Sequence, residues 1–304
     1  MVEFYREIRN VSRFYLAEAP ERLASKPASG VRSELGRMFD ERMQALLSRY
    51  SSDPPSVREI ALGYEAVGKQ FGLNHNRAAG MSGEAQFYYG RAIAAMQPLY
   101  DAGRADQHGS VILGRSSCGL ARLRERESDP ASKERARLDF ERCLAILRGA
   151  LGSNPSPGDP FVYEFVMAHF WAGDHELAAG RPTEARLLVE DGLRIARRQT
   201  SSDKRAPVWE SAALLCLARI DRPRASELVR QARDRLAQAE TDPPAAIDFG
   251  MRLHEVELAL ARVRVGDAAP EAAEKALAAL HRDFPSHPLA LEISREWNSP
   301  ARSK

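Results

Sequence analysis

Two short segments of this 304-residue chain place histidine next to acidic residues, the combination from which zinc sites and metalloprotease helices are built. His169 and His175 stand six positions apart, and six helical positions rotate by about 600°, so the two rings face different sides. His254 and Glu255 begin a His-Glu pair, but Leu258 occupies the place of the second histidine ligand. Neither segment predicts a metal site, and we expect structural roles for these histidines.

A second coincidence concerns kinase chemistry. Asp248, Phe249 and Gly250 spell the magnesium-binding triplet of protein kinases, and Ala-Pro-Glu follows at 269–271. A kinase also needs a Gly-rich phosphate loop, a strand lysine paired with a helix glutamate, and a His-Arg-Asp motif upstream, all of which the sequence lacks. No Gly-x-Ser-x-Gly, P-loop or dinucleotide fingerprint is present either. The sequence predicts a protein that is not an enzyme and that binds no metal or cofactor.

The three cysteines, Cys118, Cys143 and Cys216, are odd in number, widely separated and embedded in apolar helical sequence. A disulfide framework or a zinc site would need closer pairs. We therefore expect all three to be buried free thiols, a common state of cysteine in intracellular proteins.

Composition and charge do not point to a nucleic acid or a membrane as the partner. With 44 basic and 42 acidic residues the net charge is +2, which does not call for nucleic acid or an anionic membrane. No apolar run approaches the roughly 20 residues of a spanning helix, and the charged start of the chain is unlike a signal peptide. A cytoplasmic location is the expectation. The cluster Arg194, Arg197 and Arg198 fits the end of a helix, where cations complement the helix dipole.

Helix-forming sequence accounts for almost the whole chain, with Pro- and Gly-rich breaks that divide it into about a dozen segments. Pro182, Pro223 and Pro270 are each expected just inside the start of a helix, where the missing N–H is harmless.

A helical pair recurs along the chain. Its second helix carries apolar or small residues at offsets 0, +4 and +7, which lie on one stripe of a helix. A small residue in the first helix precedes this triplet by twelve positions in three units, as Gly173 precedes Ala185, and by seventeen in two others. The triplets are Ala85/Tyr89/Ala92, Ala136/Phe140/Cys143, Ala185/Val189/Gly192, Ala225/Val229/Ala232 and Ala273/Leu277/Leu280.

This pattern predicts an all-α fold, a right-handed α-solenoid of about five degenerate tetratricopeptide-like helix pairs. The expected array spans residues 56–300 and ends with a helix around Leu289 to Trp297. An N-terminal helical pair at residues 1–50 is expected to lead into it.

The stretch from Ile60 to Ile93 resembles the first tetratricopeptide unit in the C-terminal tails of a group of bacterial serine/threonine protein kinases. The resemblance implies a helical repeat module that in those proteins follows the catalytic domain, and it suggests a bacterial signalling context. The later units share only the small-residue skeleton. The matching positions are Tyr64, Val67, Gly68, Gly72, Asn74 or Asn76, Gly80 and Ala85.

Arrays of this kind usually bind other proteins, so we expect a scaffold or regulatory module that binds a partner peptide or helix. A nucleic-acid-binding helical repeat and an enzyme without a recognisable motif remain alternatives, and the oligomeric state is open. The clamp of chaperone-tail binders is absent, because it needs lysine where Glu65 stands and asparagine where Lys69 stands. The helical register places these candidate groove residues on the inner face: Glu65, Lys69, Phe170, Asp174, Glu210 and Leu214.

Overall fold

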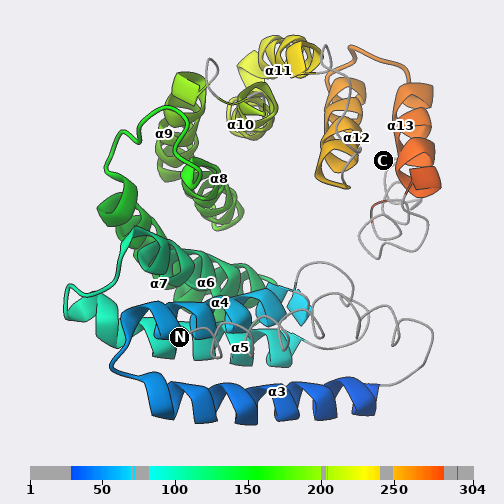
Figure 1. Ribbon diagram of the computed structural model, residues 1–304. Coiled ribbons are helices and arrows are strands. Elements are labelled where there is room, and N and C mark those ends of the chain that lie inside the picture. The colour runs from blue at the N-terminus through cyan, green and yellow to red at the C-terminus, as the bar shows by residue number, and fades with distance from the viewer. Residues whose placement is uncertain are drawn as a thin grey trace. The chain divides into compact units, whose positions relative to one another are not determined.

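The computed structural model describes residues 29–69, 71–72, 82–199, 203, 205–239, 249–283 and 293. These residues form eleven α-helices and one 3-10 turn, and they contain no strand, so the all-α prediction is confirmed (Figure 1). The chain divides into two compact units, Met1–Ala150 and Leu151–Lys304, and each is described here by itself. The predicted division into residues 1–50 and 56–300 stays a prediction.

The first unit contains α3 (Ser29–Tyr50), α4 (Pro54–Lys69), α5 (Ser82–Asp101), α6 (Gln107–Glu125) and α7 (Pro130–Leu151). Helix α4 contacts α3, α5 and α6, and α5 contacts α6. Phe39 of α3, Tyr64 of α4 and Tyr88 of α5 share one buried cluster, with the Phe39 and Tyr64 rings edge to face at 5.6 Å. The first helix that the structure describes therefore shares a core with α4 and α5.

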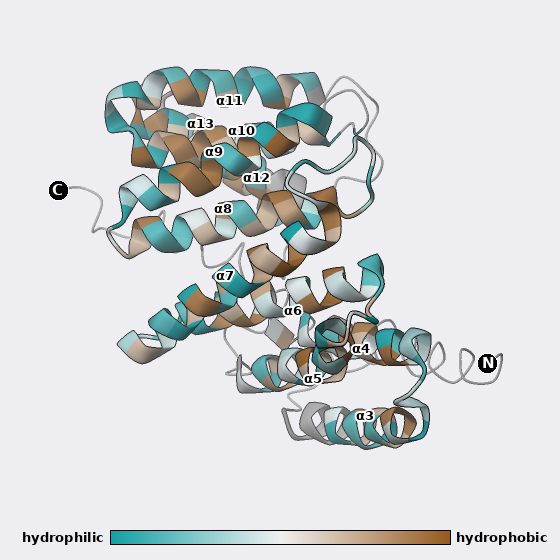
Figure 2. Ribbon diagram, turned by 90° about the vertical axis from the view of Figure 1, so that its left-hand side faces the viewer, coloured by the Kyte–Doolittle hydropathy of each residue, from teal (hydrophilic) through white to brown (hydrophobic). Residues whose placement is uncertain are grey.

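The second unit contains α8 (Val162–Ala178), α9 (Pro182–Gln199), α10 (Ala206–Ile220), the 3-10 turn η4 (Arg222–Arg224), α11 (Ala225–Ala239), α12 (Phe249–Arg264) and α13 (Pro270–Asp283). Consecutive helices from α8 to α13 contact one another, and α10 also contacts α8 and α12. The visible ribbon of α10 is mostly brown (hydrophobic) in Figure 2, while that of α11 is largely teal (hydrophilic). Alternate helices are thus buried on several sides, and the helices between them keep a polar face.

The apolar triplets lie on buried faces of their helices, as their spacing predicts. All of their residues are buried except Ala225, which is half-buried. In the pair α8–α9, a Cβ added to Gly173 would lie 2.6 Å from Cγ2 of Val189 and 3.2 Å from the carbonyl oxygen of Ala185. Gly173 therefore allows the close approach of the two helices that the sequence pattern indicates.

Aspartates cap several helices of the first unit. Oδ1 of Asp106 accepts a 2.7 Å hydrogen bond from the N–H of Gly109 at the start of α6. Asp129 caps α7 in the same way, accepting from the N–H of Ser132 at 3.0 Å, and this backbone hydrogen bond is the main cause that lowers the Asp129 pKa. Each of these carboxylates satisfies an N–H group at the helix start that has no partner within the helix.

Proline positions agree with the sequence analysis except at one turn. Pro182 and Pro270 are the first residues of α9 and α13, as predicted. Pro223 instead lies in η4, and α11 begins after it at Ala225, so that prediction is wrong. The reason is local, since Arg222–Arg224 completes a tighter turn before the α-helix starts. The predicted helix at 289–297 and residues 1–28 of the N-terminal pair lie outside the described residues, apart from Ile293.

Candidate functional site

Glu65 of α4 is the most deeply buried acidic group among the described residues of the first unit, with its residue only 1% exposed. Its carboxylate is ion-paired with Arg115 of α6 and with Lys69 one turn further along α4, at 2.8 Å. A buried carboxylate is stable only when it is paired in this way, because its own desolvation is unfavourable. The pair with Arg115 therefore joins α4 to α6 inside the protein.

Tyr89 of α5 lies next to this ion pair. Its ring is held between two glycines, because a Cβ on Gly68 of α4 would be 3.1 Å from the ring and one on Gly119 of α6 only 2.4 Å. The hydroxyl is buried and has no hydrogen-bond partner among the residues that the structure describes. Burial, reinforced by the charge of Glu65, raises the Tyr89 pKa above its ordinary value. The site is a packed helix junction and leaves no room for a substrate at the hydroxyl.

Two acidic residues of the second unit make comparable contacts between helices. Glu210 of α10 is 1% exposed, with Oε2 at 3.2 Å from Nε of Arg235 in α11 and at 3.7 Å from Nε of Arg197 in α9. Asp174 of α8 accepts a 2.8 Å hydrogen bond from Arg219 of α10. In both units, acidic groups that the sequence analysis assigned to a groove pair with arginines of neighbouring helices.

The six predicted groove residues therefore separate into two groups. The expectation of an exposed face is wrong for Glu65, Phe170, Glu210 and Leu214, since each is at most 3% exposed. The physical reason is that consecutive helices contact one another over this face, so it lies within the core. Lys69 and Asp174 keep 44% and 39% of their side chains exposed. A contact of these two with a partner stays a prediction.

A buried Ser-His pair was missed by the sequence analysis. Nε2 of His254 in α12 lies 2.9 Å from Oγ of Ser211 in α10, and Nδ1 lies 3.6 Å from Glu257. The arrangement has the residue types of a hydrolase triad. However, Oγ of Ser211 donates to the carbonyl oxygen of Ala232 at 2.8 Å, and Ser211 is 0% exposed. This hydroxyl cannot reach a substrate, so the geometry indicates a structural connection between α10, α11 and α12.

Replacing this serine tests the structural reading. Ser211→Ala leaves the carbonyl of Ala232 and the ring of His254 without their buried partner, so we expect the free energy of unfolding to fall by about 1–2 kcal/mol. Urea unfolding followed by circular dichroism measures this change. Ser226→Ala, at an exposed position of α11, is the matched control and should change stability by less than about 0.5 kcal/mol. Equal effects of the two substitutions would contradict the structural role.

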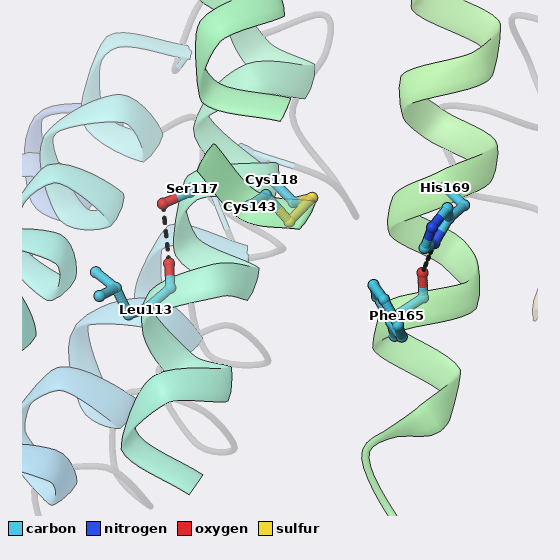
Figure 3. Close-up of a disulfide and its surroundings, with 6 residues drawn as sticks. All are labelled: Leu113, Ser117, Cys118, Cys143, Phe165 and His169. Carbon is cyan, nitrogen blue, oxygen red and sulfur yellow. Dashed lines mark hydrogen bonds between the residues drawn. A yellow bond between two sulfur atoms is a disulfide. The ribbon is translucent and has the colours of Figure 1, made fainter. Parts of the chain in front are cut away.

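No histidine in the described part of the chain belongs to a cluster of metal ligands. Nδ1 of His169 lies 2.8 Å from the carbonyl oxygen of Phe165, one turn earlier in α8 (Figure 3). No group of three or more His, Cys, Asp or Glu side chains in the described residues could hold a metal ion. Of the kinase-like triplet, Asp248 lies outside the described residues, while Phe249 and Gly250 begin helix α12.

The cysteine prediction is wrong for two of the three residues. Cys118 of α6 and Cys143 of α7 form a disulfide, with their Cα atoms 5.5 Å apart and both residues buried (Figure 3). They are 25 positions apart in sequence, but the turn between α6 and α7 brings them together. Cys216 is the free cysteine of the described residues, and burial raises its pKa well above the ordinary value. A thiol with a raised pKa is a poor nucleophile.

None of the described helices is both long and apolar enough to span a bilayer. The contacts above define an all-α protein whose buried polar groups connect helices.

Comparisons with known proteins agree with this class without giving a family. No protein-family model matches the sequence, and no curated protein matches it. Among solved structures, the chain is similar to BtubC (BKLC) from P. vanneervenii, with a TM-score of 0.54 and 14% sequence identity. The similarity covers 83% of this chain and 90% of that one. At this identity the comparison shows a shared fold alone.

Proposed function

We propose that this chain is a protein–protein interaction module, built as a right-handed α-solenoid of about five degenerate tetratricopeptide-like pairs. The observation that carries the proposal is the alternation of helix types in the second unit. Helix α10 contacts α8, α9, α11 and α12, while α9 and α11 are amphipathic. Repeated pairs that bury one helix and expose part of the next are typical of helical repeat arrays.

The described residues also supply reasons to prefer binding over catalysis. The buried acidic residues are paired with arginines, the Ser211 hydroxyl is enclosed, and the disulfide removes two of the three thiols from chemistry. The resemblance of residues 60–93 to the tails of bacterial serine/threonine kinases supports a role in bacterial signalling. In this role the chain would bind a peptide or helix of a partner and would not transform it.

Affinity capture from a bacterial lysate tests the proposal and the remaining groove residues together. Partners recovered by the wild-type chain should be recovered about tenfold less by Lys69→Gln/Asp174→Asn, because both side chains are exposed and charged. The control variant Glu274→Gln/Lys275→Gln removes one charge of each sign from the exposed surface of α13 and should recover the same partners as wild type.

The outcomes separate the alternatives. No protein enriched over empty resin would refute the interaction module. Equal recovery by all three baits would refute only the role of Lys69 and Asp174. Retardation of DNA or RNA that weakens steeply with salt would instead support the nucleic-acid-binding alternative.

A further inference from the structure

The outward face of α5 differs from that of the other second helices of the pairs. Relative to the first residue of each apolar triplet, positions −2, +2, +5, +9 and +13 lie on the opposite, outward stripe. In α5 these positions carry no charge, and four of the five residues are exposed while Gly90 is half-buried. The residues of this stripe, here called the α5 face, are Gly83, Phe87, Gly90, Ala94 and Pro98.

The same stripe is charged in the four corresponding helices that the structure describes. In α9, which has the same register 100 positions later, it reads Thr183, Leu187, Glu190, Arg194 and Arg198, and all five are exposed. Charged residues also occupy it in α7, α11 and α13, as at Glu141, Arg230 and Lys275. A solvent-facing helix stripe without a charge over four turns is typical of a surface that binds another protein.

Phe87 stands out of the middle of the α5 face. Its residue is 46% exposed, and the guanidinium carbon of Arg91 lies 4.8 Å from the ring centroid. Around it, a Cβ added to Gly83 or Gly90 would have no atom within 4 Å. The face therefore has one projecting ring, with a position that lacks a side chain about one turn before it and another about one turn after it. A second helix can approach the backbone of α5 closely at these two positions.

The charges beside the stripe are complementary to those of a second copy. Glu84 precedes Phe87 by three positions and Arg91 follows it by four, which places them about 4.5 Å and 6 Å along the helix axis on opposite sides of the ring. Glu84 makes no ion pair with any described residue. Arg91 is paired with Asp40 of α3 at 2.9 Å and still keeps 36% of its side chain exposed. When a second α5 helix lies antiparallel to the first, its Arg91 lies next to Glu84 of the first helix and its Glu84 lies next to Arg91.

We propose that two copies of this chain associate through the α5 face, with the α5 helices antiparallel about a two-fold axis midway between Phe87 and Gly90. Each Phe87 ring then packs over Gly90 of the other copy, and Glu84 of each copy faces Arg91 of the other. An interface of this kind is isologous, which is the usual form of a protein homodimer. Exposed aromatic and arginine side chains at its centre are the residue types that dominate binding energy.

Sedimentation equilibrium of the full chain across micromolar concentrations tests the proposal. Wild type should show a reversible monomer–dimer equilibrium. Phe87→Ala should raise the dimer dissociation constant by at least about tenfold, because the central ring is lost. Leu187→Ala, at the equivalent exposed position of α9, is the matched control and should leave the constant unchanged.

Two further variants make the test specific to this face. Gly90→Glu/Ala94→Arg gives α5 the residues that α9 has at these positions, and it should be monomeric while remaining folded, because both new residues are good helix formers. Glu84→Arg places like charges together across the axis and should also weaken the dimer. A wild type that stays monomeric, or a dimer equally stable in every variant, would overturn the proposal. A monomer that binds a different protein through Phe87 would overturn the choice of a second copy.

Discussion

Removing the disulfide between Cys118 and Cys143 is expected to lower the free energy of unfolding by about 3–4 kcal/mol. The bond closes a loop across 25 positions. A cross-link over a loop of this length lowers the conformational entropy of the unfolded chain, which stabilises the folded protein by the stated amount. Urea unfolding should show the loss in Cys118→Ala/Cys143→Ala relative to oxidised wild type. Reduced wild type should unfold close to the double variant, and a reducing agent should leave the double variant unchanged.

Thiol labelling provides an independent check on the bond itself. The unfolded, unreduced chain should take up one alkylating group, at Cys216, and three after reduction. The disulfide assignment is falsified if three groups attach without reduction. Cys216→Ala should then leave no reactive thiol in the oxidised protein, which assigns the single label.

Gly119→Ala is expected to destabilise the first unit by about 1–2 kcal/mol, because overpacking typically costs about 1–3 kcal/mol. The new Cβ would lie 2.4 to 2.8 Å from three ring carbons of Tyr89, and the ring has Gly68 close by as well. Helix propensity acts in the opposite direction, since alanine is favoured over glycine by about 1 kcal/mol. The steric effect should be the larger one, because a ring held between two helices cannot move away.

Gly149→Ala provides the control for this prediction. Gly149 lies within α7, and its added Cβ would meet the Tyr100 hydroxyl at 3.5 Å, an ordinary van der Waals distance. We expect it to raise the free energy of unfolding by about 0.5–1 kcal/mol. If Gly119 lies as close to Tyr89 as the structure shows, thermal and urea unfolding should give a lower free energy of unfolding for Gly119→Ala and a higher one for the control variant. Stabilisation by both substitutions would show that the Tyr89 ring is not confined.

Sequence periodicity was enough to predict the helices and their buried stripes. Gly173, Ala185 and Val189 were recognised because their spacing within and between two adjacent helices is a local property of the chain. The packing that the structure shows around Gly173 agrees with that reading. Spacing within a helical pair does not show which further helix covers the other face of that pair. For this reason the exposure expected at Glu65 and Glu210 was wrong.

The sequence carries weaker signals for contacts between residues that are far apart in the chain. Cys118 and Cys143 come together across a helical turn, and no spacing rule within one helix can show that. The pair of Ser211 and His254 joins positions 43 apart. A signal did exist for Ser211, since it is a polar residue in the otherwise largely apolar helix α10, and such a residue needs a buried partner.

The position of α10 has a consequence for how the second unit comes apart. This helix is flanked by α8, α9, α11 and α12, so losing it would uncover apolar surface on four neighbours at once. Local unfolding that begins at α13 and α12 is therefore not expected to extend to α10. A proteolytic cut between α9 and α10 would leave two fragments with exposed apolar surface, which are prone to aggregate. The second unit should melt as one cooperative block.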